Sequence, residues 1–176
     1  MSLALGMRMV RETDPRLLWK FGYNFGFKGM RSVQRFKKRL EQGQVFPPFL
    51  YLSIINSCNL RFTGCWVDVA APRAKLSFEE LDQLVTSAKK HGNAFFGILG
   101  GEPFLHPDLI RLLAAHPDCY FQIFTNGHFI DDAMAKELRR VGNATPLISL
   151  EGNAEESDER RKRSDVYAKT LAGLEA

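Results

Sequence analysis

Long apolar runs are missing from this chain of 176 residues, and cysteine is scarce, with three residues in all. No run approaches the roughly 18–20 apolar residues that a transmembrane helix needs. The first residues, MSLALGMRMVRETD, hold an apolar stretch that is too short and too weak for a secretion signal. Three cysteines are too few for a disulfide scaffold, and clustered cysteines in a reducing compartment more often bind metal. We therefore expect an intracellular, cytoplasmic protein without a transmembrane segment.

Positive charge is concentrated near the amino terminus. From Met1 to Val45 there are ten basic and three acidic residues, which gives +7. The whole chain carries +4, so the remainder carries −3. The basic excess therefore belongs to an arm, and we predict a basic helical arm at residues 1–46 and a body at residues 47–176.

Helix signals and helix-weakening residues are mixed in the arm. Asp14 can cap a helix that has Pro15 at its first position. Gly22, Gly26 and Gly29 weaken that helix, and we expect them to break it in two. Two interpretations of the arm stay open. It packs its aromatic side chains on the body, or it is an amphipathic arm for a membrane surface or nucleic acid.

Strand-like and helix-like segments alternate through the body. This alternation predicts a parallel sheet with right-handed crossovers, as a barrel or as a doubly wound sheet. Ser77 is expected to cap the first helix, with Glu80 completing a capping box. The expected strands are Phe49–Ile55, Ala94–Gly100, Cys119–Thr125 and Thr145–Glu151. The expected helices are Ser77–His91, His106–His116, Ile130–Gly142 and Asp165–Ala176.

An unusual short segment follows each expected strand. These segments are NSCNLRFTGCW, GGEPF, NGHF and EGN, in chain order. Ligands bind at the carboxyl ends of the strands in both candidate architectures. We therefore expect the four segments to form one site.

The first of these segments contains two cysteines in a polar loop. Thiolates can converge on an iron–sulfur cluster from such a loop, and Cys58 and Cys65 have a suitable spacing. Gly64 relieves the backbone beside Cys65. Phe62 stands where a third thiolate would complete the set. Two buried apolar cysteines without a ligand are the alternative.

Two further segments offer polar groups to a ligand. Gly100 and Gly101 let the backbone approach a ligand closely, and the Glu102 carboxylate suits an ammonium group. Ser149 and Glu151 lie two residues apart on one face of the fourth strand, a pair that suits sugar hydroxyls. The alternatives are an exposed acid at a turn and the polar edge of an incomplete barrel.

Together these segments resemble the radical S-adenosylmethionine (SAM) superfamily. Its signature is Cys-x-x-x-Cys-x-x-Cys after the first strand, and Phe62 occupies the middle cysteine position here. The resemblance runs from about Pro47 to the end of the chain. The matching segments are CNLRFTGC (58–65), GGEP (100–103), TNG (125–127), SLEG (149–152) and SDERR (157–161).

The resemblance implies an α/β fold, a partial TIM-like barrel of about four βα units with parallel strands after the basic helical arm. It also implies a 4Fe-4S cluster, SAM as the bound small molecule, an unknown substrate for radical chemistry, and an electron donor. The implied metal ligands are Cys58 and Cys65. The implied cofactor-binding residues are Gly100, Gly101, Glu102, Pro103, Asn126, Ser149 and Glu151.

The sequence departs from the family pattern at one ligand position. Phe62 has no donor atom, so we predict that the cluster lacks one ligand and that SAM cleavage is impaired. Cys119 is expected at the amino end of its strand, roughly 20 Å away. His106 and His128 lie in loops on the correct side and could ligate iron. The alternative function is a non-catalytic SAM- or nucleotide-binding module on the same scaffold.

The number of strands is the second departure. The family core has six βα units, and only four fit into this sequence. Strand four would then be an unprotected parallel edge. Two explanations are open: the chain is a fragment, or a partner covers that edge.

Overall fold

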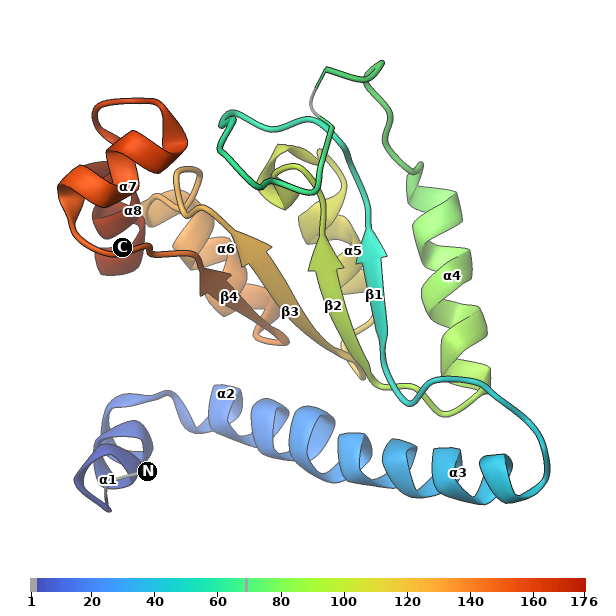
Figure 1. Cartoon of the computed structure of the whole chain (residues 1–176). Coiled ribbons are helices and arrows are strands. Elements are labelled where there is room, and N and C mark those ends of the chain that lie inside the picture. Colours follow the sequence, from blue (N-terminus) through green and yellow to red (C-terminus); the bar gives the residue numbers. More distant parts are fainter. Residues whose placement is uncertain (1–2, 69) are drawn as a thin grey trace.

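One open parallel sheet forms the centre of the body (Figure 1). The computed structural model describes residues 3–68 and 70–176. Its strands follow the order β1-β2-β3-β4, so neighbours in sequence are neighbours in space. All three strand pairs are parallel, which confirms the predicted α/β class and places β4 at one edge. The strands are β1 (Leu50–Ser53), β2 (Phe95–Leu99), β3 (Tyr120–Thr125) and β4 (Ala144–Ile148).

Helices connect the strands and also follow the last one. Ser77 forms the predicted capping box at the start of the first connecting helix. Its Oγ accepts a hydrogen bond from Glu80 N at 3.2 Å, and Glu80 Oε2 accepts one from Ser77 N at 2.7 Å. The elements are α4 (Phe78–Lys90), η2 (Pro103–Leu105), α5 (Leu109–Ala115), α6 (Asp132–Val141), α7 (Ala154–Arg161) and α8 (Val166–Glu175).

The fourth strand is shorter than predicted. It ends at Ile148, which pairs with Thr125, the last residue of β3. Ser149 N still donates a hydrogen bond to Thr125 O at 2.9 Å, and the chain then leaves the sheet. Ser149 and Glu151 therefore lie in the loop after β4 and not on the strand, which corrects the predicted placement of this pair.

Two helices also differ from their predicted positions. The helix expected from His106 begins at Leu109, because the short 3-10 helix η2 and a turn come first. Helix α7 was not predicted, since its sequence AEESDERR lacks the apolar periodicity that marks an amphipathic helix. A capping box between Asn153 and Glu156 begins it instead.

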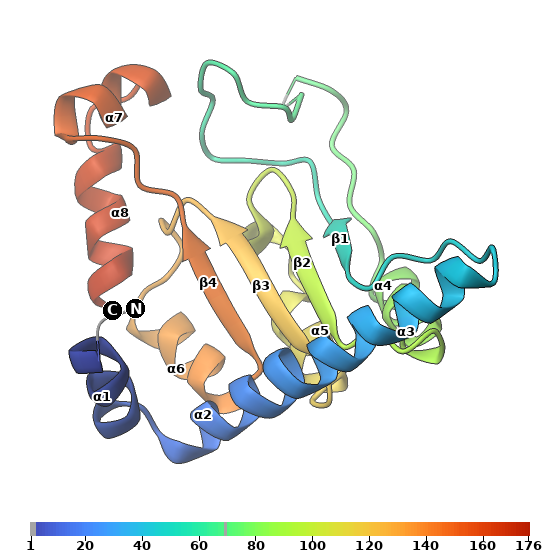
Figure 2. The ribbon, with the colours of Figure 1, turned by 60° about the horizontal axis from the view of Figure 1, so that its bottom comes forward.

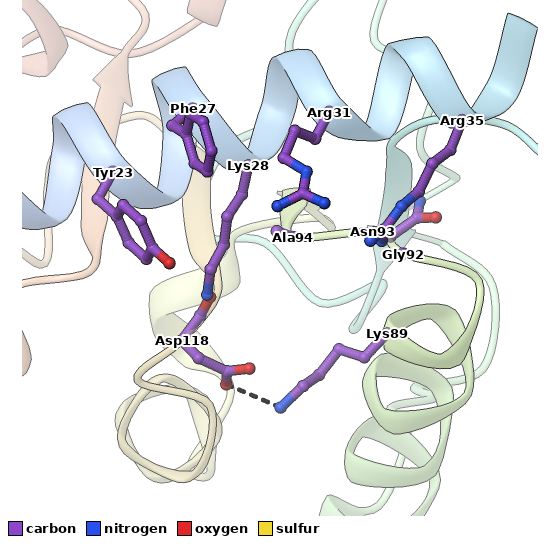
Figure 3. Close-up of a pocket in the computed structure, with 10 residues that line it drawn as sticks. All are labelled: Tyr23, Phe27, Lys28, Arg31, Arg35, Lys89, Gly92, Asn93, Ala94 and Asp118. Atoms are coloured by element: carbon purple, nitrogen blue, oxygen red, sulfur yellow. Dashed lines mark hydrogen bonds and ion pairs between the residues drawn. The ribbon is translucent and has the colours of Figure 1, made fainter.

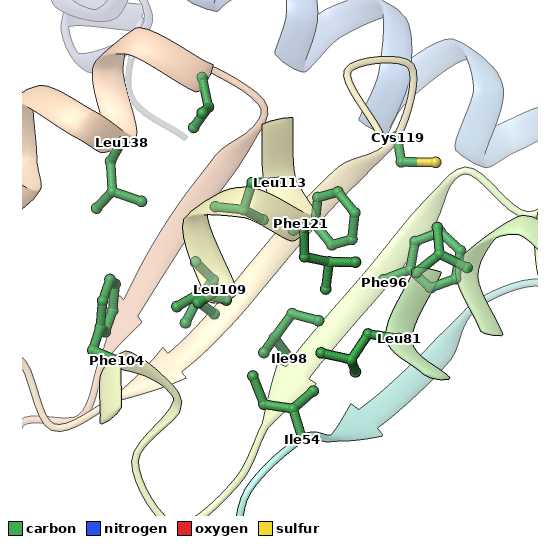
Figure 4. Packing of buried hydrophobic residues seen from close by; sticks show 14 of the residues in the cluster. Ile54, Leu81, Phe96, Ile98, Phe104, Leu109, Leu113, Cys119, Phe121 and Leu138 are labelled. Atoms are coloured by element: carbon green, nitrogen blue, oxygen red, sulfur yellow. The ribbon is translucent and has the colours of Figure 1, made fainter. Parts of the chain in front are cut away.

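The hydrophobic core lies between the sheet and the helices α4, α5 and α6 (Figure 4). Alternate residues of the central strands point into it, as the two-residue period of a strand requires. Phe96 and Phe121 stack at its centre, with ring centroids 5.6 Å apart. Leu81 of α4 and Leu113 of α5 are fully buried against them. This core fixes the strands whose carboxyl ends carry the candidate site.

The arm lies across the amino ends of the strands (Figures 1 and 2). Asp14 caps its main helical run as predicted, because its side chain accepts a hydrogen bond from Arg16 N at 2.7 Å. The expected break at the glycines is wrong: the run stays helical, with wider π-helical turns in its middle. The elements of the arm are α1 (Leu3–Glu12), α2 (Pro15–Lys20), η1 (Phe21–Lys28) and α3 (Gly29–Glu41).

The arm packs on the body through aromatic rings and lysine side chains. The ring of Phe25 meets that of Phe95 with centroids 5.0 Å apart. Lys20 Nζ donates a hydrogen bond to Val141 O at 2.6 Å. These contacts favour the first interpretation of the arm. Within the described residues, no helix combines the length and the apolar content that crossing a membrane requires.

Candidate functional site

The predicted site segments meet in one cavity at the carboxyl ends of the four strands. Its volume is about 200 Å³, below the roughly 300–1,000 Å³ of pockets that enclose a whole ligand. Of the predicted site residues, all except Pro103 line it. Lining side chains or backbone come from Cys58, Phe62, Cys65, Gly100, Gly101, Glu102, Asn126, Ser149, Glu151 and Arg161, among others.

Glu102 connects the ends of β2 and β3. Its side chain is buried, and Oε1 accepts hydrogen bonds from Thr125 Oγ1 at 2.7 Å and Phe104 N at 3.2 Å. Oε2 accepts one from Asn126 N at 2.9 Å. Burial raises the pKa of Glu102, and these hydrogen bonds partly offset the rise. The carboxylate therefore borders the cavity with both oxygens already engaged, which the sequence did not indicate.

The two glycines of the second segment lie directly against the cysteine loop. Gly101 N donates a hydrogen bond to Ile55 O at 2.6 Å, and the next residue donates to Ser57 O at 2.9 Å. A Cβ atom on Gly101 would lie 2.2 Å from Ser57 O, and one on Gly100 would lie 2.7 Å from Ile55 O. We expected a ligand to approach these two glycines closely, and the backbone of the chain itself does so instead. These glycines hold the cysteine loop in place.

Replacing Gly101 with alanine is expected to destabilise the protein by about 1–3 kcal/mol, because the new methyl group meets rigid backbone. Urea denaturation measures the effect. Gly26→Ala is the matched control, since a Cβ there meets no atom within 4 Å and alanine favours the helix. Equal stability of Gly101→Ala and the unmodified protein would contradict this role.

The two cysteines of the loop differ in what surrounds them. Cys58 Sγ accepts a hydrogen bond from Leu60 N at 3.4 Å, and burial raises the pKa of its thiol. Cys65 is half-buried in the same cavity. Cys119 is fully buried just before β3, at the opposite end of the strand, where burial raises its pKa to about 12. Its predicted position away from the site is confirmed.

Phe62 fills the middle position of the loop with an aromatic ring. The guanidinium carbons of Arg160 and Arg161, on α7, lie 5.7 and 5.3 Å from the ring centroid. The next residue, Thr63, donates its backbone N–H to Arg160 O at 3.4 Å. Phe62 therefore attaches the cysteine loop to α7 through cation–π contacts. It brings no atom that can bind iron.

A third metal ligand is missing from the described part of the chain. No group of three or more His, Cys, Asp or Glu residues there is placed to hold a metal ion. His106 is occupied on both ring nitrogens, by Leu76 O at 2.8 Å and by Asp108 N at 3.1 Å. The His128 ring contacts Asn59 Nδ2 at 3.3 Å. Neither histidine lines the cavity, so the idea that they replace the missing thiolate is wrong. The residues present do not fit a cluster held by three thiolates.

Arg161 is a site residue that the sequence did not identify as one. Its side chain is 3% exposed and borders the cavity. Nη2 donates to Ser149 O at 3.3 Å and lies 3.4 Å from Glu151 Oε1. Arg160 Nε lies 3.3 Å from Glu151 Oε2 without hydrogen-bond geometry. The segment SDERR did not indicate that Arg161 would be buried, because charged residues on a polar helix usually face water.

This arrangement leaves two buried polar atoms without a hydrogen-bond partner in the described structure. They are Arg161 Nε, a donor, and Glu151 Oε2, an acceptor. Both residues line the cavity. Buried polar groups are nearly always hydrogen-bonded, so these two atoms are the ones in this cavity with capacity left for a ligand.

Comparisons with known proteins agree with this geometry. The family model described as "Radical SAM superfamily" matches residues 52–176. An Fe-coproporphyrin III synthase from Methanosarcina barkeri is 30% identical over 131 residues, covering 72% of this chain and 33% of that protein. A GTP 3',8-cyclase from Campylobacter jejuni is 31% identical over 135 residues, covering 72% of this chain and 42% of that protein.

Solved structures show the same fold. SuiB from Streptococcus suis, solved with bound S-adenosylmethionine, aligns with a TM-score of 0.64 and 23% identity, over 80% of this chain and 34% of that one. The structure of anSMEcpe with bound AdoMet aligns with a TM-score of 0.59 and 25% identity, over 72% of this chain and 39% of that one. The chain spans about a third to two fifths of the length of the curated relatives it matches.

Proposed function

Because the chain belongs to the radical SAM superfamily, we propose that it binds SAM at the carboxyl ends of its strands and that its iron–sulfur chemistry is impaired. The observation that carries this proposal is the composition of the cavity wall. Two thiols and an aromatic ring stand where the family pattern has three thiols, while the polar lining of the other strand ends is retained.

The unpartnered atoms of the cavity fit two groups of SAM. A carboxylate accepts hydrogen bonds from guanidinium nitrogen, so Arg161 Nε suits the carboxylate of the methionine part. Ribose hydroxyls donate hydrogen bonds, so Glu151 Oε2 suits the ribose. The cavity is small enough that only part of SAM lies inside it. The remainder would lie along the open face of the sheet.

The impairment follows from the number of iron ligands. A 4Fe-4S cluster depends on thiolate ligands, and this loop supplies Cys58 and Cys65 only. Reductive cleavage of SAM requires that cluster, so we propose that the chain performs it poorly or not at all.

A second candidate is a non-catalytic SAM- or nucleotide-binding module. The same donor and acceptor favour it, since neither Arg161 Nε nor Glu151 Oε2 needs iron to bind a ligand. A nucleotide shares the ribose of SAM and lacks the methionine carboxylate. Competition between SAM and adenosine therefore separates a site for SAM from a site for nucleotides in general.

Calorimetric titration of the iron-free protein with SAM tests the proposal. We expect Arg161→Met to weaken SAM binding at least about tenfold, because a charge-assisted hydrogen bond contributes about 1.5–3 kcal/mol. Arg163→Met is the matched control, since Arg163 is exposed and pairs with Asp165 outside the cavity. Arg161→Lys keeps the positive charge of the side chain. It is the variant in which a loss of SAM binding can be told apart from a loss of folding.

Two results of that titration would contradict the proposal. Binding that Arg161→Met leaves unchanged would remove Arg161 from the site. Adenosine that competes as strongly as SAM would favour the nucleotide-binding module, because the methionine part would then contribute nothing.

A further inference from the structure

A second polar cavity lies at the opposite end of the sheet, between the arm and the loops that precede β2 and β3 (Figure 3). Its volume is about 230 Å³. The arm contributes Tyr23, Phe27 and three basic side chains to its wall. Since SAM is proposed at the carboxyl ends of the strands, this cavity is separate from that site. Nothing in the family resemblance gives it a role.

Positive charge dominates the lining of this cavity. Its cations are Lys28, Arg31, Arg35 and Lys89, and its one carboxylate is Asp118, which leaves a net charge of +3. Asp118 Oδ1 is paired with Lys89 Nζ at 2.7 Å, and Lys28 Nζ donates to Asp118 O at 2.7 Å. The carboxylate is therefore already neutralised by a partner of its own.

The two arginines keep their hydrogen-bonding capacity. Neither guanidinium has a hydrogen bond or an ion pair with any residue in the described ranges. Arg31 lies over the Phe27 ring at 5.6 Å, and its guanidinium points from α3 toward the body (Figure 3). Arg35 packs over Gly92, where a Cβ atom would lie 2.5 Å from Nη1. Both planar groups thus lie at the cavity with free donors.

A buried amide completes the polar wall. Asn93 is 3% exposed, and its Nδ2 donates a hydrogen bond to Pro47 O at 3.1 Å. That bond fixes the orientation of the amide. Its Oδ1 is buried without a hydrogen-bond partner in the described structure. An unpartnered acceptor next to free guanidinium donors indicates a ligand that carries both an anionic group and a hydroxyl.

From these contacts we infer that this cavity binds the phosphate group of a small phosphorylated molecule. Guanidinium groups match phosphate oxygens with paired hydrogen bonds, which a lone lysine does not do. A P–OH group or a ligand hydroxyl would donate to Asn93 Oδ1. The confined volume suits a phosphate or a pyrophosphate better than an extended polymer, which needs a continuous basic track.

Inorganic pyrophosphate is the probe for this inference. We expect it to bind the full chain in a calorimetric titration, with an affinity that falls as salt is added. The double variant Arg31→Gln/Arg35→Gln should weaken binding by at least about tenfold, since it removes the charge-assisted hydrogen bonds that both guanidinium groups would donate to the phosphate oxygens. Both side chains are exposed, so folding should be unaffected.

The matched control is Lys37→Gln/Lys38→Gln, which removes the same charge from exposed positions of α3 that do not line the cavity. We expect this variant to retain pyrophosphate binding within about twofold, because a screened distant charge contributes little. An equal loss of pyrophosphate binding in both double variants would show that net charge alone explains the effect, and it would overturn the inference. So would a failure of pyrophosphate to bind the unmodified chain.

A separate binding assay tests whether the phosphate belongs to a small molecule or to a membrane lipid. Vesicles that contain phosphatidylserine offer the same anionic chemistry at a surface, next to the exposed aromatic side chains of the arm. Vesicle binding that pyrophosphate does not displace would overturn the assignment to a small molecule. Pyrophosphate binding without vesicle binding supports it.

Discussion

Replacing Glu102 with alanine is expected to lower the free energy of unfolding by about 3–5 kcal/mol, a large effect for one side chain. The change leaves three donors without an acceptor in a buried place: Thr125 Oγ1, Phe104 N and Asn126 N. Each unsatisfied buried group costs about 1–3 kcal/mol, and relaxation recovers part of the sum. Urea denaturation followed by circular dichroism gives the value.

Two further variants test the cause of this loss. Glu102→Gln keeps one acceptor oxygen and the size of the side chain, so its stability should lie between those of Glu102→Ala and the unmodified protein. Glu79→Ala is the matched control on an exposed carboxylate and should change stability by no more than about 0.5 kcal/mol. If Glu102→Ala lowered the free energy of unfolding as little as Glu79→Ala does, the buried hydrogen bonds of Glu102 would not be needed for stability.

The parallel direction of the strands and the meeting of the site segments could be predicted from the sequence. Alternating apolar strands and amphipathic helices imply a parallel sheet, and a parallel sheet gathers the residues after each strand at one edge. Cys58, Gly101 and Glu151 come from three of those segments and line one cavity. This part of the prediction needed no side-chain contacts, only the direction of the strands.

The roles of individual side chains could not be predicted in this way. Glu102 was expected to face a ligand, and its burial depends on how β2 and β3 are aligned with each other. Gly100 and Gly101 act through backbone contacts with a segment more than 40 residues earlier. Arg161 lies on a helix without apolar periodicity, so no pattern marked its side chain as buried.

Phe62 is a packing residue at the position where the family pattern has its middle cysteine. Its ring contacts Arg160 and Arg161, and each cation–π contact at a partly exposed site contributes about 0.5–1 kcal/mol. Phe62→Cys therefore loses a modest amount of loop packing and gains a third thiol. We expect the variant to remain folded and to gain the ability to hold iron.

A second variant separates the two effects of the ring. Phe62→Ala removes its bulk without adding a thiol, so it tests whether crowding alone prevents cluster assembly. We expect this variant to behave like the unmodified protein, because it still has only two thiols at the cavity. Cys119→Ala is a further control, since the fully buried Cys119 lies at the other end of β3.

Iron and sulfide content after anaerobic reconstitution and gel filtration tests the central claim most directly. We predict roughly four iron atoms per chain in Phe62→Cys, the content of a 4Fe-4S cluster. We predict far lower content in the unmodified protein and in Phe62→Ala. Equal iron content in the unmodified protein and in Phe62→Cys would contradict the claim that Phe62 is the defect in this site.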